Sequence, residues 1–345
     1  MLTLEKFEQA SEIVKRVTNP TKLVYSDYLS QQTGGKVYLK PENMQYTGAY
    51  KLRGAYYKIS TLSEEERAKG LITASAGNHA QGVAYAAKAF GCKATIVMPT
   101  VTPLIKVNRT KSYGAEVILH GDVYDDACAK AYELAEEHGY TFVHPFDDLD
   151  VATGQGTITM EIIQELPTVD YILAPIGGGG LITGVSTLAK MLNPKIKVIG
   201  VEPAEAASMK AALKAGHVVT LPSANTIADG TAVKTVVSIL SGGNMDVITM
   251  SSIVQHGLIQ RDRIFSVSVL LPDKPGELVR VADTIAKAQG NVIKLEHNQF
   301  VSTNRNAAVE LRITMESFGT EHKKEILKAL EDNGYKPKSI SAKLY

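Results

Sequence analysis

Cysteine is scarce in this 345-residue chain. Its only two cysteines, Cys92 and Cys128, match neither a CxxC redox motif nor a zinc framework. The eight histidines form no HExxH motif, so we predict no metal site. Charge of either sign is not in excess, because 37 Lys and Arg face 36 Asp and Glu. This balance argues against nucleic-acid or membrane partners. We expect two buried free thiols.

Long apolar runs are also missing. The N-terminal segment MLTLEKFEQASEIVKRV has charged residues throughout, where a signal peptide needs an uninterrupted apolar stretch. No run of about 18 apolar residues occurs elsewhere. The sequence therefore predicts a soluble, cytoplasmic protein that is long enough for two or three domains.

Short apolar strands alternate with helix-length segments between about residues 65 and 200. Strands are expected at 94–99, 115–120 and 171–176, and a helix is expected at 124–138. This alternation is typical of parallel α/β sheets with helices on their faces. The class predicted for this region is therefore α/β.

The last eighty or so residues follow another order, after a predicted linker at 251–263. The expected elements are a strand at 264–271, a turn at 273–276, a helix at 277–289, strand-rich stretches at 292–300 and 307–315, a helix at 321–331, and a strand near Lys338. This βαββαβ order is that of ferredoxin-like domains.

Four consecutive glycines follow the strand expected at 171–176 and precede a helix-like segment. A strand-to-helix junction without side chains lets an anion approach backbone N–H groups at a helix N-terminus. A flexible loop is the alternative. Because neither GxGxxG nor GxxxxGK fits, the anion expected here is the single phosphate of a small cofactor. The glycines are Gly177, Gly178, Gly179 and Gly180.

Lys51 lies in the opening turn of a helix expected within KPENMQYTGAYKLRGA, residues 40–55. Most lysines are solvated surface residues. Lys51, however, is flanked by Tyr50, Leu52 and Ala55, and a desolvated lysine has a lowered pKa and can become an imine-forming nucleophile. Both interpretations stay open on this motif alone.

Two further segments end or begin elements with polar residues. The segment ASAGNHAQG, residues 74–82, stands at the start of an expected helix, where its backbone and side-chain donors would suit a carboxylate. The alternative is that Ser75 or Asn78 is a plain N-cap and that His79 is a packed histidine. VVSILSGGN, residues 236–244, places Ser241 after a buried strand, where α/β sheets bind ligands, unless it is simply a tight turn.

Taken together and in this order, KPENMQYTGAYKLRGA, SAGNHAQG, PIGGGGL and SILSGGN resemble the threonine/serine dehydratase family over about residues 19–244. The resemblance implies a tryptophan-synthase-β-like fold with two parallel-sheet α/β domains at 1–250, the smaller, about 50–148, inserted in the larger. It implies pyridoxal 5'-phosphate, deamination of L-threonine to 2-oxobutanoate and of L-serine to pyruvate by elimination of water, and a homodimer or homotetramer. Residues 264–345 resemble the amino-acid-binding ACT domain, whose ligand turn would be 273–278.

The resemblance also implies roles for individual residues. Lys51 would hold the cofactor as a Schiff base and remove the Cα proton, Asn78 would bond the ring hydroxyl, and Ser241 would face the pyridine nitrogen. The phosphate would be cradled by Gly177, Gly178, Gly179, Gly180 and Leu181. The substrate carboxylate would lie on the loop formed by Ser75, Ala76, Gly77, Asn78 and His79. Because related serine racemases carry a second hydroxyl at the position of Ala76, racemisation is expected to be weak.

The sequence departs from the family after residue 234. In family members several dozen residues separate the DGTAVK stretch, here 229–234, from the SGGN strand, whereas here Thr235 follows directly. Such a loss removes apolar packing surface from the larger domain. Two functions stay open: a threonine ammonia-lyase regulated through an amino-acid effector, and a catalytically impaired amino-acid-binding regulatory protein. The intact motifs favour the lyase.

Overall fold

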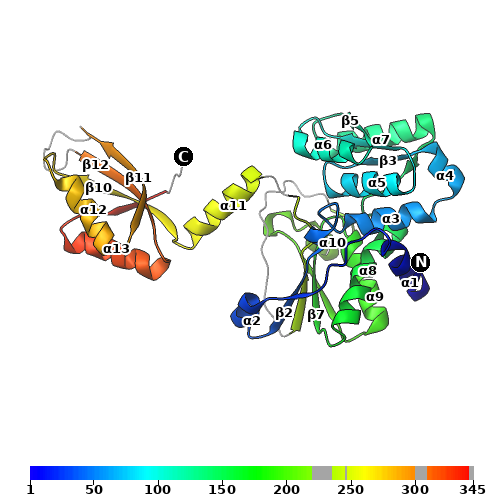
Figure 1. The fold of residues 1–345 in the computed structure, drawn as a ribbon, viewed down its shortest axis with the longest axis horizontal. Coiled ribbons are helices and arrows are strands. Elements are labelled where there is room, and N and C mark those ends of the chain that lie inside the picture. Colours follow the sequence, from blue (N-terminus) through cyan, green and yellow to red (C-terminus); the bar gives the residue numbers. More distant parts are fainter. Residues whose placement is uncertain (220–234, 245–246, 300–308, 342–345) are drawn as a thin grey trace. The chain divides into compact units, whose positions relative to one another are not determined.

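The computed structural model describes residues 1–219, 235–244, 247–299 and 309–341. It has two compact units, Met1–Asn244 and Met245–Tyr345, both drawn in Figure 1. The division at residue 244 differs from the predicted boundary at 250. The predicted linker at 251–263 lies largely in helix α11 (Val247–Gln260), because that segment contains no proline to break a helix.

The first unit contains two sheets. The larger has the order β1-β2-β9-β7-β8, in which all neighbours are parallel except β1 and β2. Its strands are β1 (Val24–Tyr25), β2 (Lys36–Lys40), β7 (Tyr171–Pro175), β8 (Lys197–Val201) and β9 (Thr235–Ile239). The smaller is parallel throughout, in the order β5-β4-β3-β6. Its strands are β3 (Leu71–Ala74), β4 (Ala94–Met98), β5 (Glu116–Leu119) and β6 (Thr141–Phe142). The predicted α/β class is confirmed.

Helices cover both sheets, and Figure 1 shows the smaller sheet with α5, α6 and α7 around it. The helices of this unit are α1 (Leu4–Val14), α2 (Asp27–Thr33), α3 (Lys51–Thr61), α4 (Glu64–Lys69), α5 (Asn78–Ala89), α6 (Leu104–Ser112), α7 (Tyr124–His138), α8 (Leu149–Glu165), α9 (Gly180–Leu192) and α10 (Ser208–Ala215), with 3-10 turns η1 (Glu42–Met44) and η2 (Ala204–Ala206). Helix α3 packs against α5 on the side of the smaller sheet and against α8 on the side of the larger. The element that begins at Lys51 therefore joins the two halves of the unit.

The two central strands of the smaller sheet form where the sequence is almost entirely apolar. Strands β3 and β4 are buried along their whole length, as parallel strands covered on both faces should be. The helix expected at 124–138 is confirmed as α7, and the strands expected at 94–99, 115–120 and 171–176 are confirmed within one residue at each end. Both cysteines are free but half-buried, since Cys92 lies in the turn before β4 and Cys128 on the partly covered helix α7.

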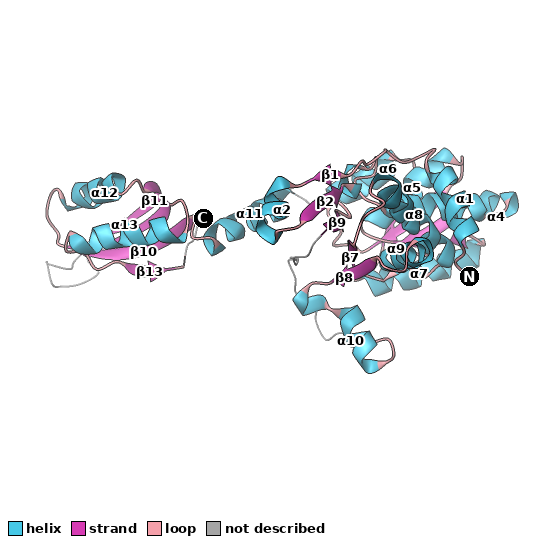
Figure 2. Ribbon diagram, turned by 90° about the horizontal axis from the view of Figure 1, so that it is seen from below, coloured by secondary structure: helices cyan, strands magenta, loops and turns pink. Residues whose placement is uncertain are grey.

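Strand β9 lies inside the larger sheet, although the sequence just before it lacks the several dozen residues expected from the family resemblance. It pairs in parallel register with β2, where Lys36 faces Thr235, and with β7, where Tyr171 faces Val236. The 229–234 stretch falls outside the described residues. Helix α10 buries none of its residues and projects from the rest of the described unit in Figure 2. The sheet thus keeps the strand that leads to Ser241.

Glycines let α9 pack closely on α8. A Cβ at Gly184 would lie 2.0 Å from the Ala152 carbonyl oxygen and 2.7 Å from the Gly156 nitrogen. We expect Gly184→Ala to lower the free energy of unfolding by about 1–3 kcal/mol, because both obstacles are backbone atoms. Urea denaturation measures the change. The matched control is Gly257→Ala in α11, where an added Cβ meets nothing within 4 Å and should not destabilise the protein.

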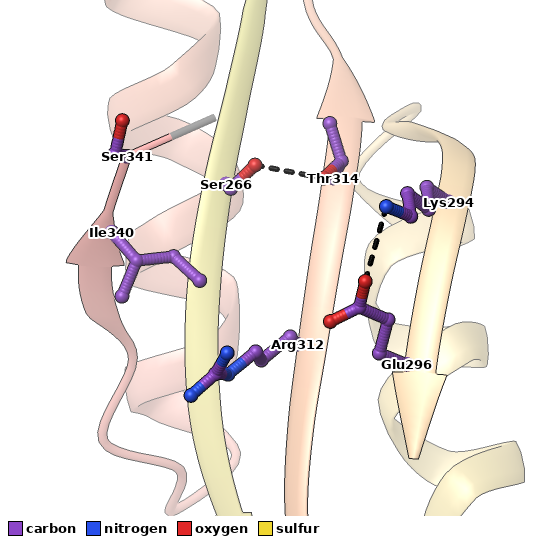
Figure 3. A pocket seen from close by; sticks show the side chains of 7 residues that line it. All are labelled: Ser266, Lys294, Glu296, Arg312, Thr314, Ile340 and Ser341. Atoms are coloured by element: carbon purple, nitrogen blue, oxygen red, sulfur yellow. Dashed lines mark hydrogen bonds and ion pairs between the residues drawn. The ribbon is translucent and has the colours of Figure 1, made fainter. Parts of the chain in front are cut away.

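The second unit has the predicted βαββαβ order. Its antiparallel sheet has the order β11-β12-β10-β13, and the buried apolar residues of α12 and α13 pack against it. Its elements are β10 (Ile264–Leu271), α12 (Glu277–Lys287), β11 (Asn291–Asn298), β12 (Val309–Glu316), α13 (Thr320–Asp332) and β13 (Lys338–Ile340). Figure 3 shows the polar face of this sheet with the helices behind it, where Ser266 bonds Thr314 at 2.7 Å and Lys294 pairs with Glu296 at 3.0 Å.

Candidate active site

Lys51 is the first residue of α3, which confirms its predicted place in an opening turn. Its Nζ donates to the Pro145 carbonyl oxygen at 2.6 Å and lies 5.5 Å from the centre of the Tyr50 ring. Burial lowers the pKa of Lys51 from 10.5 to about 8. A useful fraction of the amine is therefore neutral and nucleophilic near physiological pH.

A buried ion network holds the start of α3. Arg53 is fully buried and forms paired hydrogen bonds to Glu42 at 2.8 and 2.9 Å and to Glu161 at 2.6 and 2.9 Å. Lys40, also fully buried, adds a 2.5 Å ion pair to Glu161. Burial opposes the ionised form of Glu161, but Arg53 and then Lys40 hold its pKa below the ordinary value. The network ties β2, η1 and α8 to the helix that carries Lys51.

Sequence reasoning missed this network. Three of its four charged groups lie within KPENMQYTGAYKLRGA, where Lys51 alone was singled out. The available signal was the mixture of charged and apolar residues at 40–55. A charged side chain in a segment that is otherwise buried needs a partner of opposite charge.

The loop before α5 does not act as a simple helix cap. The N-cap of α5 is Gly77, and no side chain caps it. Ser75 Oγ accepts instead from the Gly77 N–H at 3.3 Å, and Asn78 Oδ1 accepts from Asn244 at 2.9 Å. The N-cap alternative for Ser75 and Asn78 is therefore wrong, because Gly77 takes that position. With no side chain at the cap, the first N–H groups of α5 can bind an anion.

His79 is a packed histidine. It is 2% exposed, and its Nε2 lies 3.0 Å from the Val143 carbonyl oxygen. Burial, followed by the charge of Lys51, lowers its pKa to about 3, so the ring is neutral at physiological pH. Its Nδ1 is buried without a partner in the described part of the chain, which leaves one hydrogen-bonding atom unused beside the Lys51 region.

The four glycines turn the chain from β7 into α9, as predicted. Gly179 has a φ of +90°, and a Cβ at Gly178 would lie 2.2 Å from Cγ of the Phe146 ring, so larger residues would not fit. No hydrogen bond joins the N–H groups of Gly177, Gly178 and Gly179 to another described residue. These donors and the N-terminus of α9, where Leu181 is buried, could receive an anion, and we call residues 177–181 the glycine cradle.

Ser241 follows β9 next to Lys51. Its carbonyl oxygen accepts from the Tyr50 N–H at 3.1 Å, and Ala49 forms an isolated bridge with Gly242. On the other side, Lys51 contacts Pro145, and the next residue, Phe146, packs on the glycine cradle. The structure therefore brings all four predicted motifs close to the start of α3, where Lys51 lies.

This set of groups suits one kind of ligand. The cradle favours a phosphate, Lys51 a carbonyl, and the Asn78 amide and Ser241 a ring with polar substituents. Pyridoxal phosphate combines all of these features. Among the described residues, no group of three or more His, Cys, Asp or Glu side chains is placed to hold a metal ion. In the same part of the chain, no helix is long and apolar enough to cross a membrane.

Comparison with known proteins agrees with the site. L-threonine ammonia-lyase of Thermotoga maritima is 37% identical, over 99% of this chain and 100% of the relative. Threonine deaminase isoform 2 of Solanum lycopersicum superposes with a TM-score of 0.68 at 34% identity, over 74% of this chain and 89% of that one. Maize serine racemase superposes with a TM-score of 0.68 at 28% identity, over 75% and 98% of the two chains.

The Thermotoga alignment is longer than this chain. It spans 400 positions but includes 99% of the 345 residues, about 340, so about 60 positions have no counterpart in this chain. The loss of several dozen residues after residue 234 stays a prediction. Residues 14–253 match the model of the family described as "Pyridoxal-phosphate dependent enzyme". Because of this match and the near full-length relative, the chain belongs to the pyridoxal-phosphate-dependent enzyme family.

Proposed function

We propose that the protein deaminates L-threonine to 2-oxobutanoate and ammonia, and L-serine to pyruvate, by elimination of water. The observation that carries the proposal is the half-buried Lys51 amine, whose pKa of about 8 suits proton transfer, at the meeting point of the four motifs. The near full-length similarity to a threonine ammonia-lyase names the substrate.

Each motif has a task in this proposal. Pyridoxal phosphate, when bound, supplies an aldehyde that joins an amine and a ring that withdraws electrons from the substrate Cα. Lys51 Nζ would join the aldehyde and, once released by the substrate amine, take the Cα proton. The N–H groups at the start of α5, with Ser75 and Asn78, would hold the substrate carboxylate. Residues 177–181 would hold the phosphate, and Ser241 would face the ring nitrogen.

The proposal is tested by one assay with three readouts. Purified protein is given pyridoxal phosphate and either substrate, and 2-oxobutanoate, pyruvate and D-serine are measured. We expect both oxo acids and little D-serine, because Ala76 offers no proton donor to the opposite face of the substrate. Amino-acid binding without oxo-acid release would favour the alternative, a catalytically impaired regulatory protein. D-serine formed as fast as pyruvate would contradict the role given to Ala76.

The lowered pKa of Lys51 predicts how cofactor uptake depends on pH. Only the neutral amine attacks a carbonyl, so the rate of uptake by the cofactor-free protein should rise until about pH 8 and then level off. With a solvated lysine, the rate of uptake would keep rising until the pH reached the ordinary pKa of 10.5. Stopped-flow absorbance between pH 6.5 and 10, at about saturating pyridoxal phosphate, separates the two curves. His79, with a pKa of about 3, does not titrate in this range.

The same shift fixes the sign of a stability effect. In the cofactor-free protein the unfolded chain holds the Lys51 proton more tightly than the folded one. Lys51 therefore costs stability below about pH 8, and this cost disappears as the pH rises to 10.5.

We further propose that the turn at 273–278 binds an apolar amino-acid effector such as isoleucine or valine. A cavity of about 360 Å³ lies there, bordered by Pro272, Gly276, His297 and Val309 among others. Gly276 is the N-cap of α12 with a φ of +91°, and no side chain caps the helix. Its first N–H groups can therefore receive a carboxylate. The cytoplasmic location and the homodimeric or homotetrameric assembly also remain proposals.

A pair of glycine variants tests the effector proposal. Gly276 and Gly334 have positive φ angles of 91° and 86°, and neither would place a Cβ within 4 Å of another atom. Alanine therefore strains both backbones alike. Only Gly276→Ala should weaken isoleucine or valine binding, measured by calorimetry, and abolish the effect on rate. Unchanged kinetics of the parent protein with either amino acid would refute the proposal.

A further inference from the structure

Asn244, at the end of the described range 235–244, joins three separate segments through its side-chain amide. Its Nδ2 donates to the Thr47 carbonyl oxygen at 2.7 Å and to Asn78 Oδ1 at 2.9 Å. Its Oδ1 accepts from Arg109 Nη1 of α6 at 2.7 Å. The three hydrogen bonds of this amide therefore come from three different parts of the first unit: the segment before α3, the start of α5, and α6.

The partners fix which way the Asn244 amide faces. The Arg109 guanidinium can only donate, so it selects the oxygen, and the Thr47 carbonyl can only accept, so it selects the nitrogen. A flipped amide would lose both bonds. Gly48 leaves the space for this arrangement, because a Cβ there would lie 2.4 Å from Asn244 Oδ1.

The fixed amide in turn orients Asn78. Because Asn244 presents its nitrogen, Asn78 must present its oxygen to it, and the Asn78 Nδ2 faces elsewhere. That Nδ2 lies near Gly242, 2.9 Å from the position of an added Cβ, and donates to no other described residue. The Asn78 Nδ2 donor is thus left available next to the SGGN turn that contains Ser241.

We propose that Asn244, held by Arg109 and Thr47, is a positioning residue that turns the Asn78 amide so that its NH2 group meets the ring hydroxyl of the cofactor. This inference rests on the proposed function, in which Asn78 bonds that hydroxyl. In the opposite orientation Asn78 would offer the ring oxygen an acceptor in place of a donor, and a deprotonated ring oxygen cannot bond to an acceptor. The link runs from α6, through the turn after β9, to the start of α5.

The first test is Asn244→Asp, which keeps the size of the side chain and the acceptor for Arg109 but cannot donate. We expect the dissociation constant of pyridoxal phosphate to rise about 10- to 100-fold and the visible absorbance maximum of the bound cofactor to shift. Asn108→Asp on α6 adds the same charge next to Arg109 and should change neither. Thermal unfolding of the cofactor-free proteins shows whether each variant is folded.

A double-mutant cycle tests whether Asn244 acts through Asn78. If it does, Asn78→Ala with Asn244→Asp should bind the cofactor no more weakly than Asn78→Ala alone. Additive losses, or parent affinity and spectrum in Asn244→Asp, would overturn the inference while leaving the proposed function intact. No cofactor uptake by the parent protein would instead refute the function itself.

Arg109 supplies a variant at an exposed position, in case Asn244→Asp does not fold. Arg109→Met removes the group that selects the Asn244 oxygen and should weaken cofactor binding by about three- to ten-fold, with the same direction of spectral shift. Arg109→Lys restores a donor and should recover most of the loss. Equal affinities and spectra for all three side chains would contradict the role of Arg109.

Discussion

Replacing Lys51 by alanine is expected to lower 2-oxobutanoate formation from threonine by at least about 10³-fold. The change removes both the amine that joins the cofactor and the base placed at the substrate Cα. It should leave the fold intact, since the Lys51 side chain donates one hydrogen bond to a described residue, at the Pro145 carbonyl oxygen, and carries a charge that burial disfavours. Cofactor-free Lys51→Ala should be at least as stable to urea as the parent protein.

The control is Lys88→Ala, which removes an exposed lysine of α5. Oxo-acid release and the visible absorbance of the bound cofactor should both match the parent protein there, and both should be lost in Lys51→Ala. Residual activity above about a tenth of the parent rate in Lys51→Ala would show that another group takes the Cα proton.

Arg53→Met is expected to lower the free energy of unfolding by about 3–5 kcal/mol, the largest stability effect predicted for this chain. The guanidinium pairs with two carboxylates at once. Its removal leaves the fully buried Glu42 without its cation, while the partly buried Glu161 keeps Lys40. Burial opposes the charge of Arg53, but these carboxylates raise its pKa above the ordinary value, so the charge is retained at all working pH values.

Urea denaturation of the cofactor-free protein measures this effect. Arg16→Met, at an exposed position near the end of α1, makes the same chemical change and should shift stability by less than about 0.5 kcal/mol. If the two variants unfolded at similar urea concentrations, the network would be energetically neutral. Because the network fixes the start of α3, we also expect weaker cofactor binding in Arg53→Met where it remains folded.

Local sequence patterns predicted the elements well where packing and pattern agree. Strand β4 and helix α7 follow from a continuous apolar run and from a helix-length amphipathic segment. The predicted linker at 251–263 lies largely in α11, a helix that the sequence analysis did not predict. The N-cap alternative at Ser75 failed because Gly77 takes the cap position, which depends on the backbone path out of β3.

Motif order identified the site, but its internal connections could not be read from the sequence. The hydrogen bond from Arg109 to Asn244 joins residues 135 positions apart, and the one from Arg53 to Glu161 joins residues 108 apart. Such contacts depend on how α3, α6 and α8 pack, which no local pattern encodes. The role of Lys51 was inferred from its neighbours, whereas its bond to Pro145 required the fold.

The position of β9 between β2 and β7 has a consequence for how the protein is made. The ribosome produces β2 early, at residues 36–40, yet its parallel neighbour at 235–239 emerges about 200 residues later. The smaller sheet, at 71–142, is contiguous and can form during that interval, since pairings distant in sequence form slowly. We therefore expect the nascent chain to acquire the smaller sheet first and to become competent for cofactor only when β9 inserts.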